Sequence, residues 1–497
     1  MTTQRITAGW LPGLSEDEVR WQVLPFERDG VRLEVSVPML TGAQMQALAY
    51  RVRDAADRHL RTMPVADIID VIDRAMARLL DREDPCRQQA EAWLPVVSGY
   101  DADMVRLGLT GFFKTFRAPQ LRRFVAEDFA NPAVLDGFQP APKGGAVRAF
   151  GPDLLVHSWA GNVPALSLWS TVCGLLVKAP GIGKLASAEP LFAGWFARLL
   201  AELHPPLAEC MAVVWWRGAG GEDADALYGE ADTVLAYGGN PTLDALRRRL
   251  PVTTRFLPHG HKLGLGLIAA AALDTLKAPS VARLAAWDVM RYDQQGCYSP
   301  HVFYVERGAA VSPRAFADYL AAELANLQRR FPRRTLELEE GSAVAGWQQA
   351  IEWRAMAGAA GAAGAGDSEG DEMLIGANDA PWSVAFSDHA LPLAPTASYR
   401  TIAVVAVDSL DEVVPLARQQ REFLQTAGVA ATPEELYRLA GLLGAAGVTR
   451  ICAIGSMSMP DAGWHHDGRF NLLDLVRMAE IEASAEQAAQ PLARYAD

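Results

Sequence analysis

The sequence predicts an α/β protein in which a parallel sheet of Rossmann type is joined to a second α/β domain and preceded by a helical region. From about residue 41 to 135, apolar residues recur at spacings of three and four, which is typical of amphipathic helices. From about residue 150, short apolar runs alternate with helical stretches. Alternation at this spacing indicates strands that run parallel and are joined by helices.

Each expected element follows from this pattern and from local capping residues. The helical region includes Gly42–Arg61 and Val65–Asp81. In the next stretch, Asn240 and Pro241 suit the N-cap and the first position of a helix. The expected elements there are strands at Leu175–Val177, Met211–Trp216 and Thr233–Tyr237, and helices at Glu189–Leu203, Asp223–Gly229 and Asn240–Leu250.

A second alternating block follows, and it predicts the second sheet. Its expected elements are strands at His301–Val305 and Ile402–Val407 and helices at Pro313–Gln328 and Asp411–Gln425. Between them, Ala357–Gly366 consists almost entirely of Ala and Gly, which predicts a flexible loop.

Composition narrows the class of protein. Half of the 497 residues are hydrophobic, 21% are charged and the net charge is −13, which argues against nucleic acid as the main partner. The basic runs Arg247–Arg249 and Arg329–Arg334 are interpreted as helix ends, where cations favour the dipole. The uncharged stretch Val163–Val177 is too short to span a bilayer, and the N-terminus lacks the apolar core of a signal peptide.

Cysteine and histidine usage predicts a reduced, cytoplasmic protein without a metal. The five cysteines are scattered and none has CxxC spacing. His259, His261 and the pair His465-His466 lack a third ligand placed nearby in the sequence.

Two residues are candidates for acyl chemistry, and each has a plainer alternative. Cys297 lies in Asp293-Gln-Gln-Gly-Cys-Tyr-Ser-Pro300, a tight loop ahead of a strand, although a lone cysteine is more often a small buried apolar residue. Asn162 lies in the loop Ala160-Gly-Asn-Val-Pro164 and suits either a turn or an amide donor to an oxyanion.

Two glycine-rich stretches do not match nucleotide motifs. Gly181-Ile-Gly-Lys184 lacks the first glycine and the hydroxyl residue of a Walker A loop. Gly218-Ala-Gly-Gly221 lacks the last glycine of the dinucleotide fingerprint.

Taken together and in order, the motifs resemble those of the acyl-CoA reductases of the bacterial bioluminescence type, a branch of the aldehyde dehydrogenases. The resemblance runs from about residue 50 to 485, and the Asp293–Pro300 block is its most specific part. The other matching stretches are Ala160–Pro164, Gly174–Lys178, Ala236–Gly239, Gly260–Lys262, Gly447–Gly455 and Asp467–Leu475.

The resemblance implies an aldehyde-dehydrogenase-like fold and a set of site residues. Cys297 would be the nucleophile and Asn162, 135 positions earlier, the oxyanion donor. The cofactor would be held by Lys184, 22 positions after Asn162, and by the turn Gly238-Gly239. The implied domains are residues 1–255 (helical region and NADP-binding domain), 256–440 (catalytic) and 441–497 (returning to the cofactor domain).

Two departures from the aldehyde dehydrogenase pattern sharpen the prediction. Pro258 stands where hydrolytic enzymes carry a glutamate base, so an acyl-cysteine has no activated water and exchanges with a thiol instead. Ser187 stands where NAD-preferring relatives often carry a glutamate that binds the ribose 2′-hydroxyl, which favours NADPH.

The resulting hypothesis is an NADPH-dependent reductase that converts an acyl-CoA or acyl-protein thioester to an aldehyde. The resemblance also implies a homo-oligomer and an acyl-transferase or acyl-protein synthetase as a partner. The alternatives are an aldehyde dehydrogenase working oxidatively, and a non-catalytic subunit that binds acyl chains.

Overall fold

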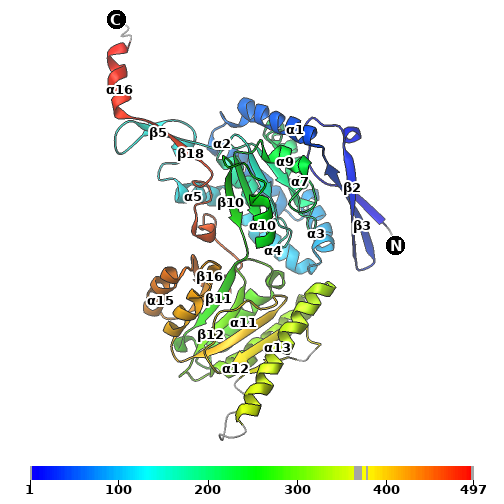
Figure 1. The fold of residues 1–497 in the computed structure, drawn as a ribbon, viewed down its shortest axis with the longest axis vertical. Coiled ribbons are helices and arrows are strands. Elements are labelled where there is room, and N and C mark those ends of the chain that lie inside the picture. The colour runs from blue at the N-terminus through cyan, green and yellow to red at the C-terminus, as the bar shows by residue number, and fades with distance from the viewer. Residues whose placement is uncertain (1–2, 363–371, 377–378, 494–497) are drawn as a thin grey trace. The chain divides into compact units, whose positions relative to one another are not determined.

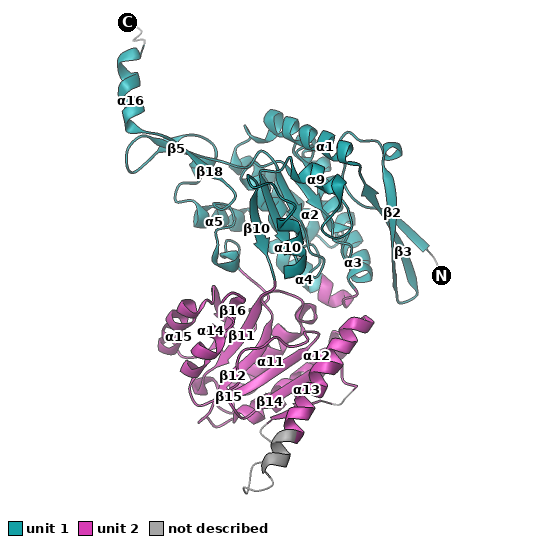
Figure 2. Ribbon diagram, in the orientation of Figure 1, with its two compact units in different colours: residues 1–98, 106–260, 461–497 teal, residues 99–105, 261–460 magenta. Residues whose placement is uncertain are grey.

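A computed structural model describes residues 3–362, 372–376 and 379–493 of the chain. The chain divides into two compact units (Figure 2): unit 1 comprises residues 1–98, 106–260 and 461–497, and unit 2 comprises residues 99–105 and 261–460. The chain thus leaves unit 1 after Gly260 and returns at Asp461. The domain limits 1–255, 256–440 and 441–497 stay a prediction.

Unit 1 is built on a five-stranded parallel sheet of order β10-β9-β6-β7-β8. Its first strand in sequence, β6, lies in the centre, with the next two strands on one side and the last two on the other. Every residue of β8 and nearly every residue of β9 is buried, as expected for a sheet covered on both faces. The strands are β6 (Leu155–Ser158), β7 (Gly181–Lys184), β8 (Met211–Val214), β9 (Thr233–Tyr237) and β10 (Arg255–His259).

Helices and two small sheets complete unit 1 (Figure 1). The helix α2 shows why these segments are helical, because its buried residues recur at spacings of three and four. The helices are α1 (Gly42–Ala55), α2 (Val65–Leu80), α3 (Pro85–Ser98), α4 (Ala102–Lys114, which begins in unit 2), α5 (Ala118–Asp128), α6 (Ser167–Leu176), α7 (Phe192–Leu203), α8 (Pro205–Ala208), α9 (Glu222–Tyr228), α10 (Asn240–Arg247) and α16 (Ala483–Ala489). The small sheets have the orders β1-β3-β2 (Thr3–Thr7, Val31–Met39, Arg20–Arg28) and β18-β5-β4 (Arg477–Ile481, Ala146–Phe150, Gln139–Pro140).

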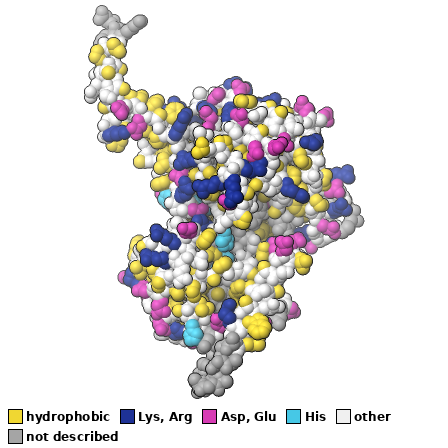
Figure 3. Space-filling view, in the orientation of Figure 1, with side chains coloured by type: hydrophobic (Ala, Val, Ile, Leu, Met, Phe, Trp, Pro, Cys, Tyr) yellow, Lys and Arg dark blue, Asp and Glu magenta, His cyan; other side chains and the backbone are white. Residues whose placement is uncertain are grey.

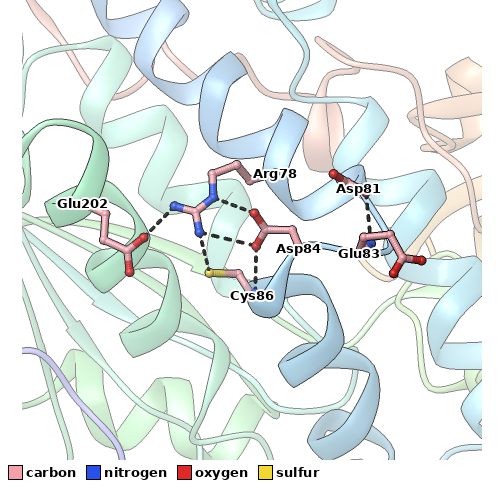
Figure 4. A network of polar contacts seen from close by, with 6 residues as sticks. All are labelled: Arg78, Asp81, Glu83, Asp84, Cys86 and Glu202. Carbon is pink, nitrogen blue, oxygen red and sulfur yellow. Dashed lines mark hydrogen bonds and ion pairs between the residues drawn. The ribbon is translucent and has the colours of Figure 1, made fainter.

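A polar network connects α2 and the turn that follows it to α7 (Figure 4). The Arg78 guanidinium donates to Asp84 at 2.7 Å and to Glu202 at 2.6 Å, and it lies 3.6 Å from the Cys86 sulfur. Cys86 therefore belongs to a structural network.

Unit 2 is a seven-stranded sheet of order β13-β14-β15-β12-β11-β16-β17, and only the edge strand β13 runs antiparallel. Separate apolar clusters pack on its two faces. The strands are β11 (Leu263–Ile268), β12 (Pro300–Glu306), β13 (Glu372–Ile375), β14 (Ser383–Ser387), β15 (Thr401–Val407), β16 (Leu424–Ala430) and β17 (Arg450–Ala453). The helices are α11 (Ala278–Met290), α12 (Pro313–Arg330), α13 (Leu338–Ala362), α14 (Val413–Arg418) and α15 (Pro433–Ala446).

The predicted α/β class with parallel sheets is confirmed, and most predicted elements lie within a few residues of the observed ones. The strand predicted at Leu175–Val177 is wrong. It falls at the end of α6, whose residues are all buried, and an evenly apolar helix has no periodicity that distinguishes it from a strand.

Three further predictions need correction. The predicted helix Asp411–Gln425 ends early, because α14 stops at Arg418 and Gln425 belongs to β16. The N-cap of α10 is Gly239, and Asn240 is the first helical residue. The loop predicted at Ala357–Gly366 is helical through Ala362, since alanine has the highest helix propensity, and residues 363–366 lie outside the described residues.

The basic run at Arg247–Arg249 closes a helix, as predicted, and has acidic partners. α10 ends at Arg247, and the next two arginines pair with Asp244 and Asp225. Figure 3 shows Lys and Arg side chains interspersed with Asp and Glu on the visible face. None of the helices among the described residues combines the length and apolar character that a membrane crossing requires.

Candidate active site

The predicted site residues of unit 1, the oxyanion donor Asn162 and the cofactor-binding residues, all lie at the carboxyl ends of neighbouring parallel strands. Asn162 follows β6, Lys184 ends β7, Ser187 comes three residues later, and Gly238-Gly239 follows β9. The connections reverse direction between β6 and β9, and in open α/β sheets ligands bind in the crevice at such a switch point. The structure thus brings five of the six predicted site residues to one edge of one sheet, whereas Cys297 belongs to unit 2.

The loop that carries Asn162 is held by a buried carboxyl group. Glu189 accepts hydrogen bonds from the backbone N–H groups of Leu191 and Phe192, each at 2.9 Å, and from that of Ala165. Burial raises the pKa of Glu189 to about 7, against the lowering effect of these bonds. Gly161 packs so closely that a Cβ there would lie 2.8 Å from the Glu189 nitrogen. Glu189 therefore joins the start of α7 to the Asn162 loop.

Lys184 and Ser187 lie on a segment shaped by two tryptophans. A Cβ at Gly183 would lie 1.7 Å from the Trp159 ring, so only glycine fits beneath this indole. Burial lowers the pKa of Lys184. Ser187 is exposed, and its hydroxyl accepts a hydrogen bond of 3.1 Å from the Trp215 indole. The Ser187 side chain is therefore positioned and still open to a ligand.

The turn Gly238-Gly239 leads directly into α10. The backbone N–H of Gly238 donates to the carbonyl of His259 at 3.2 Å, and Gly239 caps the helix without a side chain. A Cβ at either glycine would meet nothing closer than 3.9 Å. A helix N-terminus with open backbone in front of it is suited to a phosphate group.

Burial disfavours the thiolate form of Cys86, Cys173, Cys210 and Cys452. It raises the pKa of four thiols: those of Cys86 and Cys173, that of Cys210 to about 12 and that of Cys452 to about 11. A raised pKa leaves less of the nucleophilic thiolate at neutral pH. Cys297 is half-buried, and its sulfur lies 3.4 Å from the side-chain amide nitrogen of Gln425.

The loop that carries Cys297 begins with an unusual turn. Tyr292, Asp293 and Gln294 all have positive φ values, of 49°, 49° and 60°. Non-glycine residues pay a conformational cost in this region, which persists only where surrounding contacts fix it. Gly296 is required for a different reason, because a Cβ there would lie 2.3 Å from the Tyr298 ring.

A second left-handed segment, Ser398–Arg400, fixes this turn. The Arg400 guanidinium donates to the Asp293 carboxylate at 2.8 Å, and the backbone N–H of Tyr399 donates to the Asp293 carbonyl at 2.9 Å. Gln294 donates to the carbonyls of Pro300 and Thr401 at 2.8 and 2.9 Å. The cysteine loop is thus tied to the start of β15 on one side and to the start of β12 on the other.

Sequence reasoning missed several of these supporting residues. Arg334 lies in a run interpreted as a helix end, but its backbone N–H donates to Asp293 at 3.2 Å and its guanidinium binds Glu340. Arg400 lies outside the predicted elements, and Gln425 lies at the end of a predicted helix, so neither residue was connected with Cys297. Within the sequence, Gly296 and Pro300 predict a tight loop around Cys297 but do not indicate which distant residues hold it.

His259, His466 and Asp467 form the one group of potential metal ligands among the described residues, with ligand atoms within 4.8 Å of one another. The sequence offered no third ligand, and the structure supplies Asp467, which lies 2.8 Å from the His259 Nδ1. However, the two imidazole rings stack at 4.2 Å with an angle of 11°. Because an imidazole lone pair lies in the plane of its ring, the two lone pairs lie in nearly parallel planes and do not converge on a point about 2.0 Å from each nitrogen, as zinc requires. The cluster is arranged as a hydrogen-bonded His259–Asp467 pair within an aromatic stack.

The fold is that of the aldehyde dehydrogenases. An aldehyde dehydrogenase from Physcomitrella patens, solved with succinate, matches with a TM-score of 0.72 and 13% identity, over 97% of this chain and 99% of its own. The indole-3-acetaldehyde dehydrogenase AldA of P. syringae matches with a TM-score of 0.73 and 14% identity, over 95% and 96%. The predicted aldehyde-dehydrogenase-like fold is confirmed.

The sequence comparisons assign the chain to one family among the proteins that share this fold. Residues 60–478 match the family model described as acyl-CoA reductase (LuxC), and the chain belongs to this family of reductases. The long-chain acyl-protein thioester reductase of Aliivibrio fischeri is 26% identical over 399 residues, 77% of this chain and 75% of the relative. That of Photorhabdus laumondii is 23% identical over 379 residues, 74% and 72% of the two chains. The resemblance inferred from the motifs is confirmed.

Proposed function

We propose that this protein reduces a fatty acyl thioester to the aldehyde with NADPH, through an acyl group carried on Cys297. The observation that carries the proposal is the Cys297 loop, which holds a half-buried thiol beside an amide donor in a chain of the LuxC family. Membership of a reductase family favours reduction over the oxidative alternative. A non-catalytic role leaves this supported thiol unexplained.

The cofactor edge of unit 1 fits a dinucleotide. The turn at Gly238-Gly239 would bring the N-terminus of α10 to the pyrophosphate, and Lys184 and Ser187 would lie toward the adenosine ribose. The neutral hydroxyl of Ser187 favours a 2′-phosphate, where a carboxylate would repel it. NADPH, when bound, supplies the hydride that the reduction consumes.

The proposed chemistry proceeds through residues of this chain. The Cys297 thiolate attacks the thioester carbonyl, and the Asn162 amide and the backbone N–H of Cys297 donate to the oxyanion. The C–S bond to the thiol of the donor thioester breaks, and that thiol leaves and takes a proton from solvent. After hydride addition to the acyl carbon, the resulting thiohemiacetal collapses. Its C–S bond breaks, which releases the aldehyde and returns the Cys297 thiolate.

Position 258 explains why water would not intercept the acyl group. Pro258 pairs with Ala236 on the edge strand β10 and is exposed, and its ring has no titratable group. Without a general base at this position, hydrolysis lacks an activated water. The acyl-cysteine would therefore persist until reduction.

The source of the acyl group and the assembly are further parts of the proposal. The relatives are named for acyl-protein thioesters, so the acyl group would come from CoA or from a partner such as an acyl-transferase or acyl-protein synthetase. We also propose a homo-oligomer and a cytoplasmic setting, which free cysteines suit.

The test is NADPH oxidation by the purified full-length protein against a panel of acyl-CoAs of different length and aromaticity, with the aldehyde identified directly. Cys297→Ser is the matched inactive control. We expect one aldehyde per NADPH and lower rates with NADH. The proposal would be overturned if the protein oxidised an aldehyde to the acid with NADP⁺ and did not reduce any thioester. That result would favour the oxidative alternative.

A further inference from the structure

Both neighbours of strand β11 have a bulge beside Gly264. On one side Leu263 pairs with Leu424 and Leu265 with Ala427, so that Gln425 and Thr426 oppose a single residue. On the other side the register shifts as well, and His301 is the extra residue. A β-bulge redirects the side chain at the extra position and is frequent beside active sites.

Gly264 allows the cysteine loop to approach this point. A Cβ at position 264 would lie 2.5 Å from the carbonyl oxygen of Ser299 and 2.8 Å from that of Tyr298. The backbone just after Cys297 therefore rests directly on Gly264, between the two bulges. The Gln425 side chain and the Cys297 sulfur meet as a result.

The Gln425 amide has a defined orientation. Its Nε2 lies 3.4 Å from the Cys297 Sγ, and its Oε1 accepts a hydrogen bond of 3.3 Å from the Thr426 hydroxyl. The backbone carbonyl of Gln425 accepts hydrogen bonds from the backbone N–H and the hydroxyl of Thr449, at 3.0 and 3.2 Å. Gln425 and Thr426 are both 0% exposed. The Thr426 hydroxyl thus fixes which end of the amide faces the sulfur.

We propose that Gln425 is a catalytic residue of the reduction, whose amide N–H donates to the thiolate of Cys297. This inference rests on the proposed function, in which Cys297 carries the acyl group. A hydrogen bond to an ionised acceptor is stronger than one to a neutral acceptor, so the amide favours thiolate over thiol. It stabilises the thiolate before attack and again when the thiohemiacetal collapses and sulfur leaves with the bonding electron pair. Gln425 itself neither gains nor loses a proton.

The test is the pH dependence of Cys297 alkylation by iodoacetamide in the full-length protein, with the adduct assigned by peptide mass spectrometry. Gln425→Glu keeps the size of the side chain but replaces the N–H donor with a carboxylate, and Gln425→Met removes the donor without adding charge. Thr426→Val keeps the amide and removes the hydroxyl that orients it. Gln419→Glu is the matched control, because Gln419 is exposed and lies at the end of α14.

We expect the half-maximal pH of alkylation to rise by about one unit in both Gln425 variants, which corresponds to about tenfold less thiolate at a fixed pH. In these variants kcat falls by a similar factor with little change in KM, Thr426→Val shifts in the same direction by less, and Gln419→Glu behaves as wild type. Unchanged alkylation profiles in folded Gln425→Met and Thr426→Val would overturn the proposal.

The assay uses neither NADPH nor a thioester, so its outcome is separate from that of the proposed function. If Gln425 affects alkylation but Cys297→Ser still reduces thioesters, the proposed function fails while the donor role toward the sulfur stands. If Cys297→Ser is inactive and the Gln425 variants keep the wild-type kcat, only the inference about Gln425 fails.

Discussion

Asp293 and Arg400 form an ion pair whose side chains are only 2% and 3% exposed, with Arg400 nitrogens 2.8 Å from an Asp293 oxygen. The pair joins two backbone segments with positive φ, residues 292–294 and 398–400. Contacts between the two segments thus stabilise the strained backbone of both. Asp293 stands four residues ahead of Cys297, so the pair fixes the start of the cysteine loop.

Breaking this pair should destabilise the protein and disorder the cysteine loop. Arg400→Met leaves the buried Asp293 carboxylate without its partner, and such a loss costs about 3–5 kcal/mol. Urea unfolding should report this decrease. The double variant Asp293→Asn with Arg400→Met should regain part of it, because no charge is left buried. A loss below about 1 kcal/mol in the single variant would mean that the pair contributes little.

Asn162→Ala should lower kcat by about 100- to 1,000-fold, the usual cost of one oxyanion donor. Single-turnover kinetics on an acyl-CoA would measure the chemical step. Asn162→Asp is a control of equal size without the donor and should be at least as slow. A change confined to KM would instead make Asn162 a turn residue.

Ser187→Glu should move the cofactor preference from NADPH toward NADH. A carboxylate near a 2′-phosphate costs on the order of 1–3 kcal/mol, or roughly ten- to a hundredfold in affinity. Dissociation constants for both cofactors would measure it. Ser187→Ala is the matched control, because it also removes the hydrogen bond from Trp215 but adds no charge. A wild-type protein that already prefers NADH would contradict this prediction.

Glu189→Gln should remove a pH dependence of stability. Burial raises the pKa of Glu189 from 4.5 to about 7 in the folded protein, so this group favours folding at low pH and the contribution is lost as the pH rises through about 7. The wild-type free energy of unfolding should therefore fall, relative to Glu189→Gln, by on the order of 1 kcal/mol per pH unit between about pH 5 and 7. Urea unfolding across this range measures the difference. Parallel curves for the two proteins would show that Glu189 does not titrate there.

Part of this structure follows directly from local sequence. Thr233–Tyr237 is a strand as predicted, because a short apolar run with β-branched residues between turn residues favours a buried strand. Leu175–Val177 failed because α6 is buried on all sides and lacks a polar face. Whether this segment forms a helix or a strand depends on how it is buried in the folded protein, and the local sequence does not reveal that.

The candidate site shows the same division. Cys297, Asn162 and the glycine turn stand in contiguous motifs that a single segment can reveal. Gln425 reaches the sulfur only because β16 bulges against Gly264. Such a contact depends on register between strands more than 100 residues apart in the chain, so no local pattern predicts it.

The most direct test of the account is whether Cys297 becomes acylated. The protein is mixed with a long-chain acyl-CoA in the absence of NADPH, and intact mass and peptide mapping locate the acyl group. We expect one acyl group per chain on Cys297, which disappears as aldehyde when NADPH is added, and none on Cys297→Ala, whose reduction rate should be lost. An acyl group on another residue, or a Cys297→Ala variant that keeps more than a few percent of the wild-type rate, would contradict the account.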